Sequence, residues 1–130
     1  MARYPIGQWR QQFRGRTTAI ERRSVSMVYR LYCSSRGEAV HYVGRSDLGL
    51  EGRISAHVRE NGNIAGCNHN CTHVEFWIIR NSDGKLNRKL RSFRAESMAY
   101  HRYNPRCNSD HPNRRGVSEI HECPSPGCDH

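Results

Sequence analysis

The stretch VYRLYCSSRGEAVHYVGRSDL, residues 28–48, contains the pattern that decides the fold. Two apolar and aromatic runs, 27–33 and 39–44, lie on either side of SSRGE, in which Gly37 favours a turn. Short runs rich in β-branched and aromatic residues and joined by a turn predict a β-hairpin. A third run of the same kind, residues 73–80, predicts another strand.

Two helices are expected around these strands. Asp47 is a candidate N-cap for a helix over residues 47–60, which Asn61-Gly62 would end. A longer helix is expected over residues 85–103, followed by Pro105, which cannot continue it. The sequence therefore predicts a small mixed α/β domain, with a three-stranded, mostly antiparallel sheet flanked by helices.

Composition restricts the partners of this domain. The chain has 130 residues, a net charge of +9 and a sequence pI of about 9.7, so one domain and a polyanionic partner are expected. No stretch approaches the roughly 20 apolar residues that a membrane span needs, so no membrane contact is expected. The N-terminus lacks the apolar run of a secretory signal, and the expected location is the cytoplasm.

Charge is distributed unevenly along the chain. Residues 1–24 contain six arginines and one acid, and we interpret them as a basic arm with a short helix around residues 8–13. Residues 25–116 form the expected domain, and residues 117–130 form an acidic tail. The arm provides the candidate nucleic-acid-binding residues Arg14, Arg16, Arg22 and Arg23.

Residues typical of one nuclease family occur in order along the domain. Tyr29 is followed 13 residues later by Tyr42-Val43-Gly44, and Arg53 comes eleven residues after Tyr42. Glu96 lies in the long expected helix, and Asn108 follows Pro105. This series resembles the GIY-YIG nucleases, and residues 28–48 resemble the excision-repair incision subunit of that family.

The resemblance covers residues 27–108, with one departure. Met27 stands where the family has the Gly that opens its first motif. That Gly serves the backbone more than the chemistry, so no reacting group is lost.

The resemblance implies a metal-dependent endonuclease that hydrolyses phosphodiester bonds in nucleic acid, with DNA as the expected substrate. It implies that Glu96 is the ligand of a single Mg²⁺ or Mn²⁺. It implies that Arg53 stabilises the charge of the transition state. Tyr29 would be the general base or orient the attacking water, and Tyr42 would support it near the phosphate.

Three further candidates are assigned around these residues. His57 falls on the core side of its expected helix, where it either lines the site or is structural. Arg45 would bind the nucleic acid, and its charge would also lower the pKa of a nearby phenol, which is ordinarily a poor base. Asn108 is expected to hold the site together by hydrogen bonds, with Asn104 as the alternative.

Six cysteines raise the question of a metal or of disulfides. Two short-spaced pairs, Cys67 with Cys71 and Cys123 with Cys128, are suited to a structural zinc site. Free thiols and disulfides are the alternatives, and disulfides become favoured if the chain is exported.

Two other functions are compatible with these patterns. One is a zinc-stapled module that binds nucleic acid without cutting it, although a domain without activity has no need of Tyr29, Arg53 and Glu96 together. The other is an exported nuclease toxin.

Overall fold

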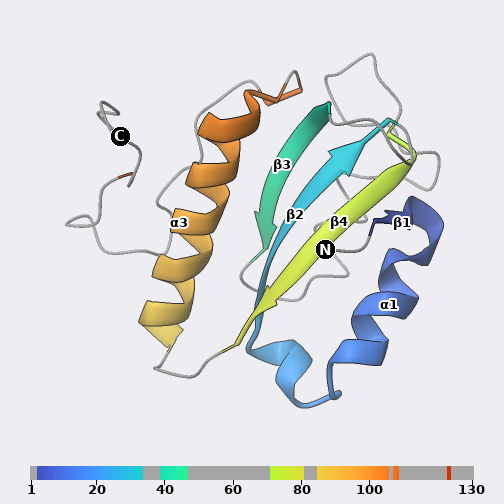
Figure 1. Ribbon diagram of the computed structural model, residues 1–130. Coiled ribbons are helices and arrows are strands. Elements are labelled where there is room, and N and C mark those ends of the chain that lie inside the picture. The colour runs from blue at the N-terminus through green and yellow to red at the C-terminus, as the bar shows by residue number, and fades with distance from the viewer. Residues whose placement is uncertain are drawn as a thin grey trace.

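The computed structural model describes residues 3–33, 39–46, 71–80, 85–105, 107–108 and 123. Its sheet contains four antiparallel strands in the order β1-β4-β2-β3, namely β1 (Tyr4–Pro5), β2 (Ser26–Tyr32), β3 (Val40–Ser46) and β4 (His73–Ile79). Figure 1 shows α3 (Lys85–Tyr103) beside β3 and α1 (Trp9–Arg16) beside β4. Two 3-10 helices, Ile6–Gln8 and Glu21–Arg23, lie before and after α1.

Strand β2 lies inside the sheet and pairs with β3 on one side and β4 on the other. Its odd-numbered residues Met27, Tyr29 and Leu31 share one face of the sheet, because side chains alternate along a strand. Its even-numbered residues lie on the other face. All its residues but Arg30 are buried, which explains why the segment is an almost continuous apolar run.

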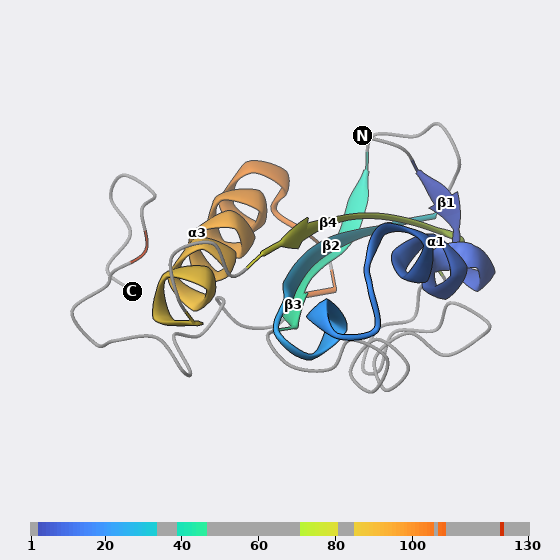
Figure 2. The same cartoon turned by 90° about the horizontal axis from the view of Figure 1, so that it is seen from below.

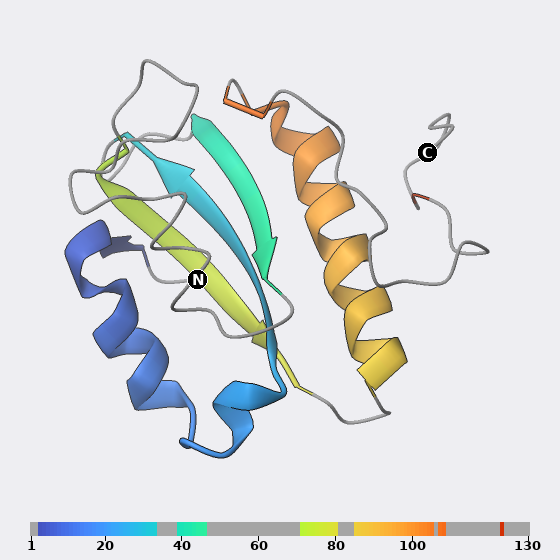
Figure 3. The ribbon, with the colours of Figure 1, turned by 180° about the vertical axis from the view of Figure 1, so that it is seen from behind.

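Each face of the sheet has its own core. The face with Tyr29 packs against Trp9 and Phe13 of α1, together with Phe76 of β4. Figure 3 shows α1 beside β4 when the molecule is seen from behind. The opposite face packs Tyr32 and Val43 against Ala99 of α3, and Figure 2 shows the two helices on different sides of the sheet. The two helices therefore enclose the sheet from opposite sides.

The predicted α/β class and antiparallel pairing are confirmed, but the predicted number of strands is wrong. The fourth strand, β1, pairs Tyr4 with Val74 and Pro5 with His73, at the outer edge of β4. A strand of two residues has no recognisable alternation of its own. It forms because the edge of β4 offers hydrogen-bond partners.

The interpretation of residues 1–24 as an arm is also corrected for the part that the structure describes. Ile6, Trp9 and Phe13 are buried in the core on the Tyr29 face. Their spacing of three and four residues is that of one helical face, but arginines surround them in the sequence. The expected helix over residues 8–13 is observed as α1 (Trp9–Arg16).

Several expected features fall outside the described residues. These are the turn at Gly37, the helix over residues 47–60, and the acidic tail apart from Cys123. In the part of the chain that is described, no helix is both long and apolar enough to cross a membrane.

A buried ionic network crosses the α3 face of the sheet. Glu75 of β4 lies opposite Arg30 of β2, and Arg30 Nη2 lies 2.9 Å from Glu75 Oε2. The Tyr32 hydroxyl donates a hydrogen bond of 2.9 Å to the same oxygen, and Arg3 lies 3.5 Å from Oε1. The Arg3 guanidinium also stacks on the Tyr32 ring, 3.6 Å from its centroid. The network therefore ties the N-terminal segment to the sheet.

This network predicts a loss of stability in alkali. Burial, followed by the hydrogen bond to Glu75, raises the pKa of Tyr32 to about 12. Below pH ~10, the ordinary phenol pKa, Tyr32 is neutral in both the folded and the unfolded chain. It then makes its full contribution to the free energy of unfolding. As pH rises from about 10 towards 12, the unfolded chain loses the proton first, so about 2–3 kcal/mol of the free energy of unfolding is lost.

The measurement is the melting temperature between pH 8 and 11.5 for the parent and for Tyr32→Phe. The variant lacks the titrating group, so its melting temperature should fall less steeply above pH 10. Parallel curves for the two proteins would show that Tyr32 does not contribute to the alkaline transition.

Candidate active site

Two of the motif tyrosines lie together on the Tyr29 face of the sheet. The rings of Tyr29 in β2 and Tyr42 in β3 are stacked, with centroids 6.0 Å apart and planes inclined by 30°. Tyr29 is only 1% exposed, whereas Tyr42 is half-buried. Solvent can therefore reach the pair from the side of Tyr42.

Gly44 determines where the Tyr29 ring lies. The two residues are cross-strand partners, and a Cβ built on Gly44 would lie 2.2 Å from Tyr29 Cζ and 2.3 Å from its hydroxyl oxygen. The phenol therefore lies directly over the backbone of β3, in space that any side chain at position 44 would fill. The glycine of the second motif thus permits a specific placement of the first tyrosine.

Glu96 of α3 approaches β3 from the other face. It forms an ion pair with Arg45, with 3.7 Å between Arg45 Nε and Glu96 Oε1. The Arg45 guanidinium carbon lies 5.6 Å from the centroid of Phe93, which is fully buried in α3. Arg45 is 8% exposed, so its main described contact is Glu96 rather than a surface phosphate. Because Arg45 pairs across from Val28, it lies on the opposite face from the two phenols.

Asn108 binds the outer edge of β3. Its side-chain Nδ2 donates to the Val43 carbonyl oxygen and its Oδ1 accepts from the Val43 amide, both at 2.9 Å. One residue earlier, the Cys107 amide donates to the His41 carbonyl oxygen at 2.8 Å. The side chain of Asn108 thus takes the place of a neighbouring strand and holds the chain after α3 against β3.

Asn104, the alternative to Asn108, has a different position. Its φ is 44°, in the left-handed region that Asn tolerates, and its amide still bonds to the Tyr100 carbonyl oxygen. It therefore terminates α3. Asn104 sets the direction in which the chain leaves the helix, and Asn108 makes the contact with β3.

The remaining motif residues are Arg53, His57 and the proposed metal ligand Glu96. Arg53 and His57 lie outside the described residues, so their positions relative to the tyrosines are not part of this geometry. Within the described ranges, no three His, Cys, Asp or Glu side chains gather closely enough to hold a metal ion. A single carboxylate oxygen from Glu96 fits Mg²⁺, which keeps several of its waters and takes few protein ligands.

The four arginines expected to bind nucleic acid divide into two groups. Arg16 donates to the Tyr4 hydroxyl and lies over the Phe76 ring, and Arg22 donates to the Thr17 carbonyl oxygen at 3.1 Å. These contacts give both residues a structural role. Arg14 and Arg23 are exposed and present their charge to solvent.

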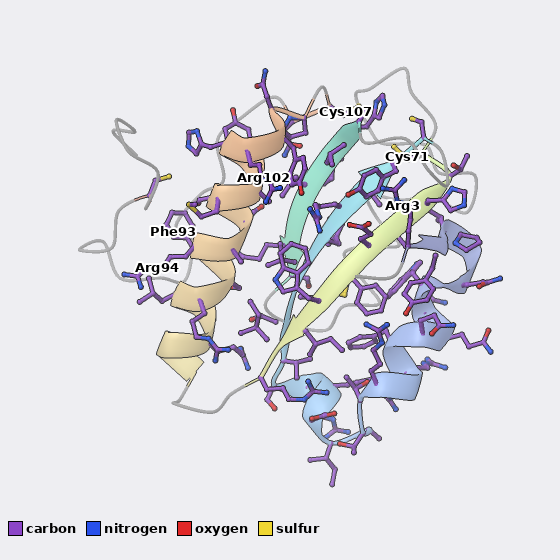
Figure 4. All side chains as sticks on the ribbon, in the orientation of Figure 1. Arg3, Cys71, Phe93, Arg94, Arg102 and Cys107 are labelled. Carbon is purple, nitrogen blue, oxygen red and sulfur yellow. The ribbon has the colours of Figure 1, made fainter. Side chains whose placement is uncertain are left out.

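A second exposed basic surface lies on α3, where it had not been expected. Arg91, Arg94 and Arg102 are exposed and recur at spacings of three and eight residues, which places them on one helical face. Figure 4 shows Arg94 pointing away from the sheet. Met98, 50% exposed, lies among them. Glu96, the helix's single acid, lies on the buried side, so this α3 outer face is entirely basic or neutral.

The cysteines are arranged differently from the two expected pairs. Cys71 contacts Cys33, with 3.9 Å between their sulfurs, whereas Cys123 belongs to neither core cluster. Cys107 is disulfide-bonded, and its partner lies outside the described residues. Cys67 and Cys128 also lie outside them, so zinc at the expected pairs stays a prediction.

Comparison of the chain with models of known protein families, with curated proteins and with solved structures found no match. The geometry around β3 is therefore the basis for assigning a function. Sequence patterns missed the α3 outer face and the Cys33–Cys71 contact. The spacing of exposed arginines could have revealed the first, but the second depends on how two distant strands pair.

Proposed function

We propose that the chain is a metal-dependent endonuclease that hydrolyses phosphodiester bonds in nucleic acid, with DNA as its substrate. One observation carries the proposal: the described motif residues meet at a single strand. Tyr42 and Gly44 lie in β3, Tyr29 lies over Gly44, and Asn108 is bonded to Val43. Glu96 joins them through Arg45. Residues separated by up to 79 positions therefore converge on four consecutive residues of β3, Tyr42 to Arg45.

The residue types around β3 suit the needs of phosphodiester hydrolysis, with the two phenols on the α1 face of the sheet and Glu96 on the α3 face. The reaction needs an oriented water and stabilisation of the negative charge that builds on phosphorus and on the leaving oxygen. Tyr29 and Tyr42 supply hydroxyls that can orient a water, and the phenolate of either could accept its proton. Arg45 lies beside Glu96, the carboxylate that would hold a divalent cation.

Glu96 would hold the metal, with Arg53 as the proposed partner of the phosphate. When bound, Mg²⁺ supplies positive charge that polarises a phosphate oxygen and lowers the pKa of a bound water. Asn108 bonds to Val43, between Tyr42 and Arg45, and so holds this part of the backbone of β3.

The experiment that tests the function is a cleavage assay with purified full-length protein. Supercoiled plasmid, single-stranded DNA and RNA are incubated separately with Mg²⁺, with Mn²⁺ and with a chelator. Nicking or linearisation of plasmid only with a divalent cation is expected. Cleavage confined to RNA would overturn the substrate, and no cleavage of any of the three would favour a module that binds without cutting.

The α3 outer face supports nucleic acid as the partner. Its three exposed arginines extend over eleven residues, which is roughly 16 Å of helix at ~1.5 Å per residue. That length is enough to meet several successive phosphates.

Replacing Arg91, Arg94 and Arg102 together with Gln should weaken binding and its dependence on salt. Each phosphate contact contributes a slope of about −0.9 in a plot of log affinity against log salt concentration. The triple variant should therefore lose up to about 2.7 units of slope, with cleavage at saturating substrate unchanged. Arg10, Arg14 and Arg23, which are exposed on the N-terminal segment, provide a matched triple variant.

Binding isotherms at five salt concentrations measure both slopes. If the slope changes less in the N-terminal variant than in the α3 variant, the phosphate contacts belong to α3. If it changes less in the α3 variant, they belong to the N-terminal segment. An unchanged slope in the α3 variant would show that this face does not touch phosphate. Deletion of residues 1–24 is unsuitable for this purpose, because it removes Trp9 and Phe13 from the core.

The disulfide at Cys107 favours a second candidate, the exported nuclease, because disulfides persist in oxidising compartments. Rapid alkylation of cells and medium followed by mass spectrometry tests this candidate. Protein found only inside the cell, with Cys107 alkylated, would exclude it.

A further inference from the structure

Two thiols from distant parts of the chain are in contact at one end of the sheet. Cys33 follows β2 and Cys71 precedes β4, and their sulfurs are 3.9 Å apart. The backbone holds the two segments together, since the Thr72 amide donates to the Tyr32 carbonyl oxygen at 2.8 Å. Figure 4 shows Cys71 at this end of the sheet, where β2 ends and β4 begins.

Both thiols are reduced and differ in their access to solvent. Cys71 is 1% exposed, whereas Cys33 is half-buried. Burial is the main cause that raises the pKa of Cys71 to about 12, and the neighbouring Cys33 raises it further. An oxidant in solution therefore meets Cys33 first.

We propose that Cys33 and Cys71 are a reversible redox pair, which forms an intramolecular disulfide by exchange with a small-molecule disulfide such as oxidised glutathione. The sulfurs need to approach by roughly 2 Å to reach the S–S bond length of ~2.05 Å. Rotation about the side-chain bonds of Cys33, whose side chain is half-buried, can supply much of this approach. The contact thus needs no rearrangement of the strands.

The exchange proceeds in two balanced steps. The Cys33 thiol loses its proton to solvent, and the thiolate attacks one sulfur of oxidised glutathione, which releases one glutathione thiolate and leaves a mixed disulfide on Cys33. Cys71 then loses its proton and attacks the Cys33 sulfur, releasing the second glutathione. Two protein thiols are oxidised, and one molecule of oxidised glutathione is reduced to two thiols.

Exposure and contact assign the two roles. Cys33 is half-buried and reacts with the oxidant, whereas Cys71 is 1% exposed and lies in contact with Cys33, where it can resolve the mixed disulfide.

The bond would close a loop that contains part of the proposed site. The two cysteines are 38 positions apart, and the loop includes β3 with Tyr42, Gly44 and Arg45. Cys33 and Cys71 also pack in the same core as Tyr29. Oxidation would thus restrict the unfolded chain and stabilise the fold around the tyrosines.

The test uses the full-length protein equilibrated with glutathione at defined ratios of oxidised to reduced form. After alkylation, peptide mapping without reduction should find the peptide of Cys33 joined to that of Cys71. The melting temperature of the oxidised protein should exceed that of the reduced protein by about 10 °C. Cys33→Ser and Cys71→Ala should each abolish that increase, and Cys123→Ser, in a cysteine that lies outside the pair and forms no disulfide, should retain it.

Mapping on the parent protein keeps the test decisive even if a variant fails to fold. Cys33 and Cys71 both alkylated at the most oxidising ratio, or joined to other cysteines, would overturn the proposal. So would one equivalent of zinc in the reduced protein that is lost in Cys71→Ala, because the pair would then be metal ligands. None of these readouts needs cleavage activity. A result that overturns the redox pair therefore leaves the proposed nuclease activity standing, and absence of cleavage leaves the redox pair standing.

Discussion

Replacing Glu96 with Gln is expected to abolish Mg²⁺-dependent cleavage while nucleic-acid binding holds or becomes tighter. The change removes the negative charge of the proposed metal ligand but keeps its size, so a loss of at least about 10³-fold in rate is expected. Binding should not weaken, because Arg45 loses its acidic partner and the site becomes more positive towards phosphate. Cleavage at saturating substrate and binding affinity are measured in parallel.

Glu75→Gln is the matched control for this change. Glu75 is likewise a carboxylate paired with an arginine, at 2.9 Å from Arg30, but it lies in β4 and does not belong to the Arg45–Glu96 pair. Its replacement should lower the melting temperature and leave the folded protein able to cut. If Glu96→Gln cuts as fast as the parent, the metal ligand has been assigned to the wrong residue.

The same comparison separates the nuclease from the non-cutting module. A module that only binds nucleic acid has no cleavage for Glu96 to support, and both glutamine variants would then differ from the parent in stability alone. If Glu96→Gln stops cutting and Glu75→Gln does not, a purely structural role for Glu96 cannot explain the difference.

The second large effect is expected at Gly44, where Ala should impair both folding and cleavage. The added methyl would lie 2.2 Å from Tyr29 Cζ, so either the phenol or the backbone of β3 must move. Overpacking of this kind costs about 1–3 kcal/mol in the free energy of unfolding. Cleavage should fall further than stability accounts for, because the displaced residue is the proposed general base.

Denaturant unfolding and single-turnover cleavage measure the two effects. Gly15→Ala is the control, since nothing lies within 4 Å of a Cβ at that position of α1 and the added methyl favours the helix. In a Tyr29→Ala background, Gly44→Ala should cost much less stability, because the clashing ring is gone. An unchanged melting temperature and rate for Gly44→Ala would show that Tyr29 does not depend on this glycine.

Some elements of the fold could be predicted from the sequence alone and others could not. The strands β2, β3 and β4 were predicted within about two residues, because each is a run of apolar and β-branched side chains. The predicted helix over residues 85–103 has the observed ends, since Asn104 and Pro105 stop it locally. The sequence did not predict β1 or the burial of the N-terminal segment in the core. The few apolar residues of that segment stand among arginines, so they form no clear pattern.

For the candidate site, too, the sequence indicates some features and the tertiary structure decides others. Its residue types and their order were evident in the sequence, and the pairing of Asn108 with Val43 agrees with the hydrogen-bonding role expected of that asparagine. That Arg45 would face Glu96 rather than a phenol was not expected. It follows from the register of β2 and β3, which places Arg45 and Tyr29 on opposite faces of the sheet.

By itself, the sequence determined the class of the fold, three of its strands and its long helix, because propensity, periodicity and helix termination depend on neighbouring residues. Only the tertiary structure decided that Gly44 makes room for Tyr29, that Glu75 pairs with Arg30, and that Cys33 contacts Cys71. Each of these contacts joins residues on different strands. Such contacts depend on strand register, on the alternation of side chains across the sheet and on the side where each helix packs, which no local stretch of sequence specifies.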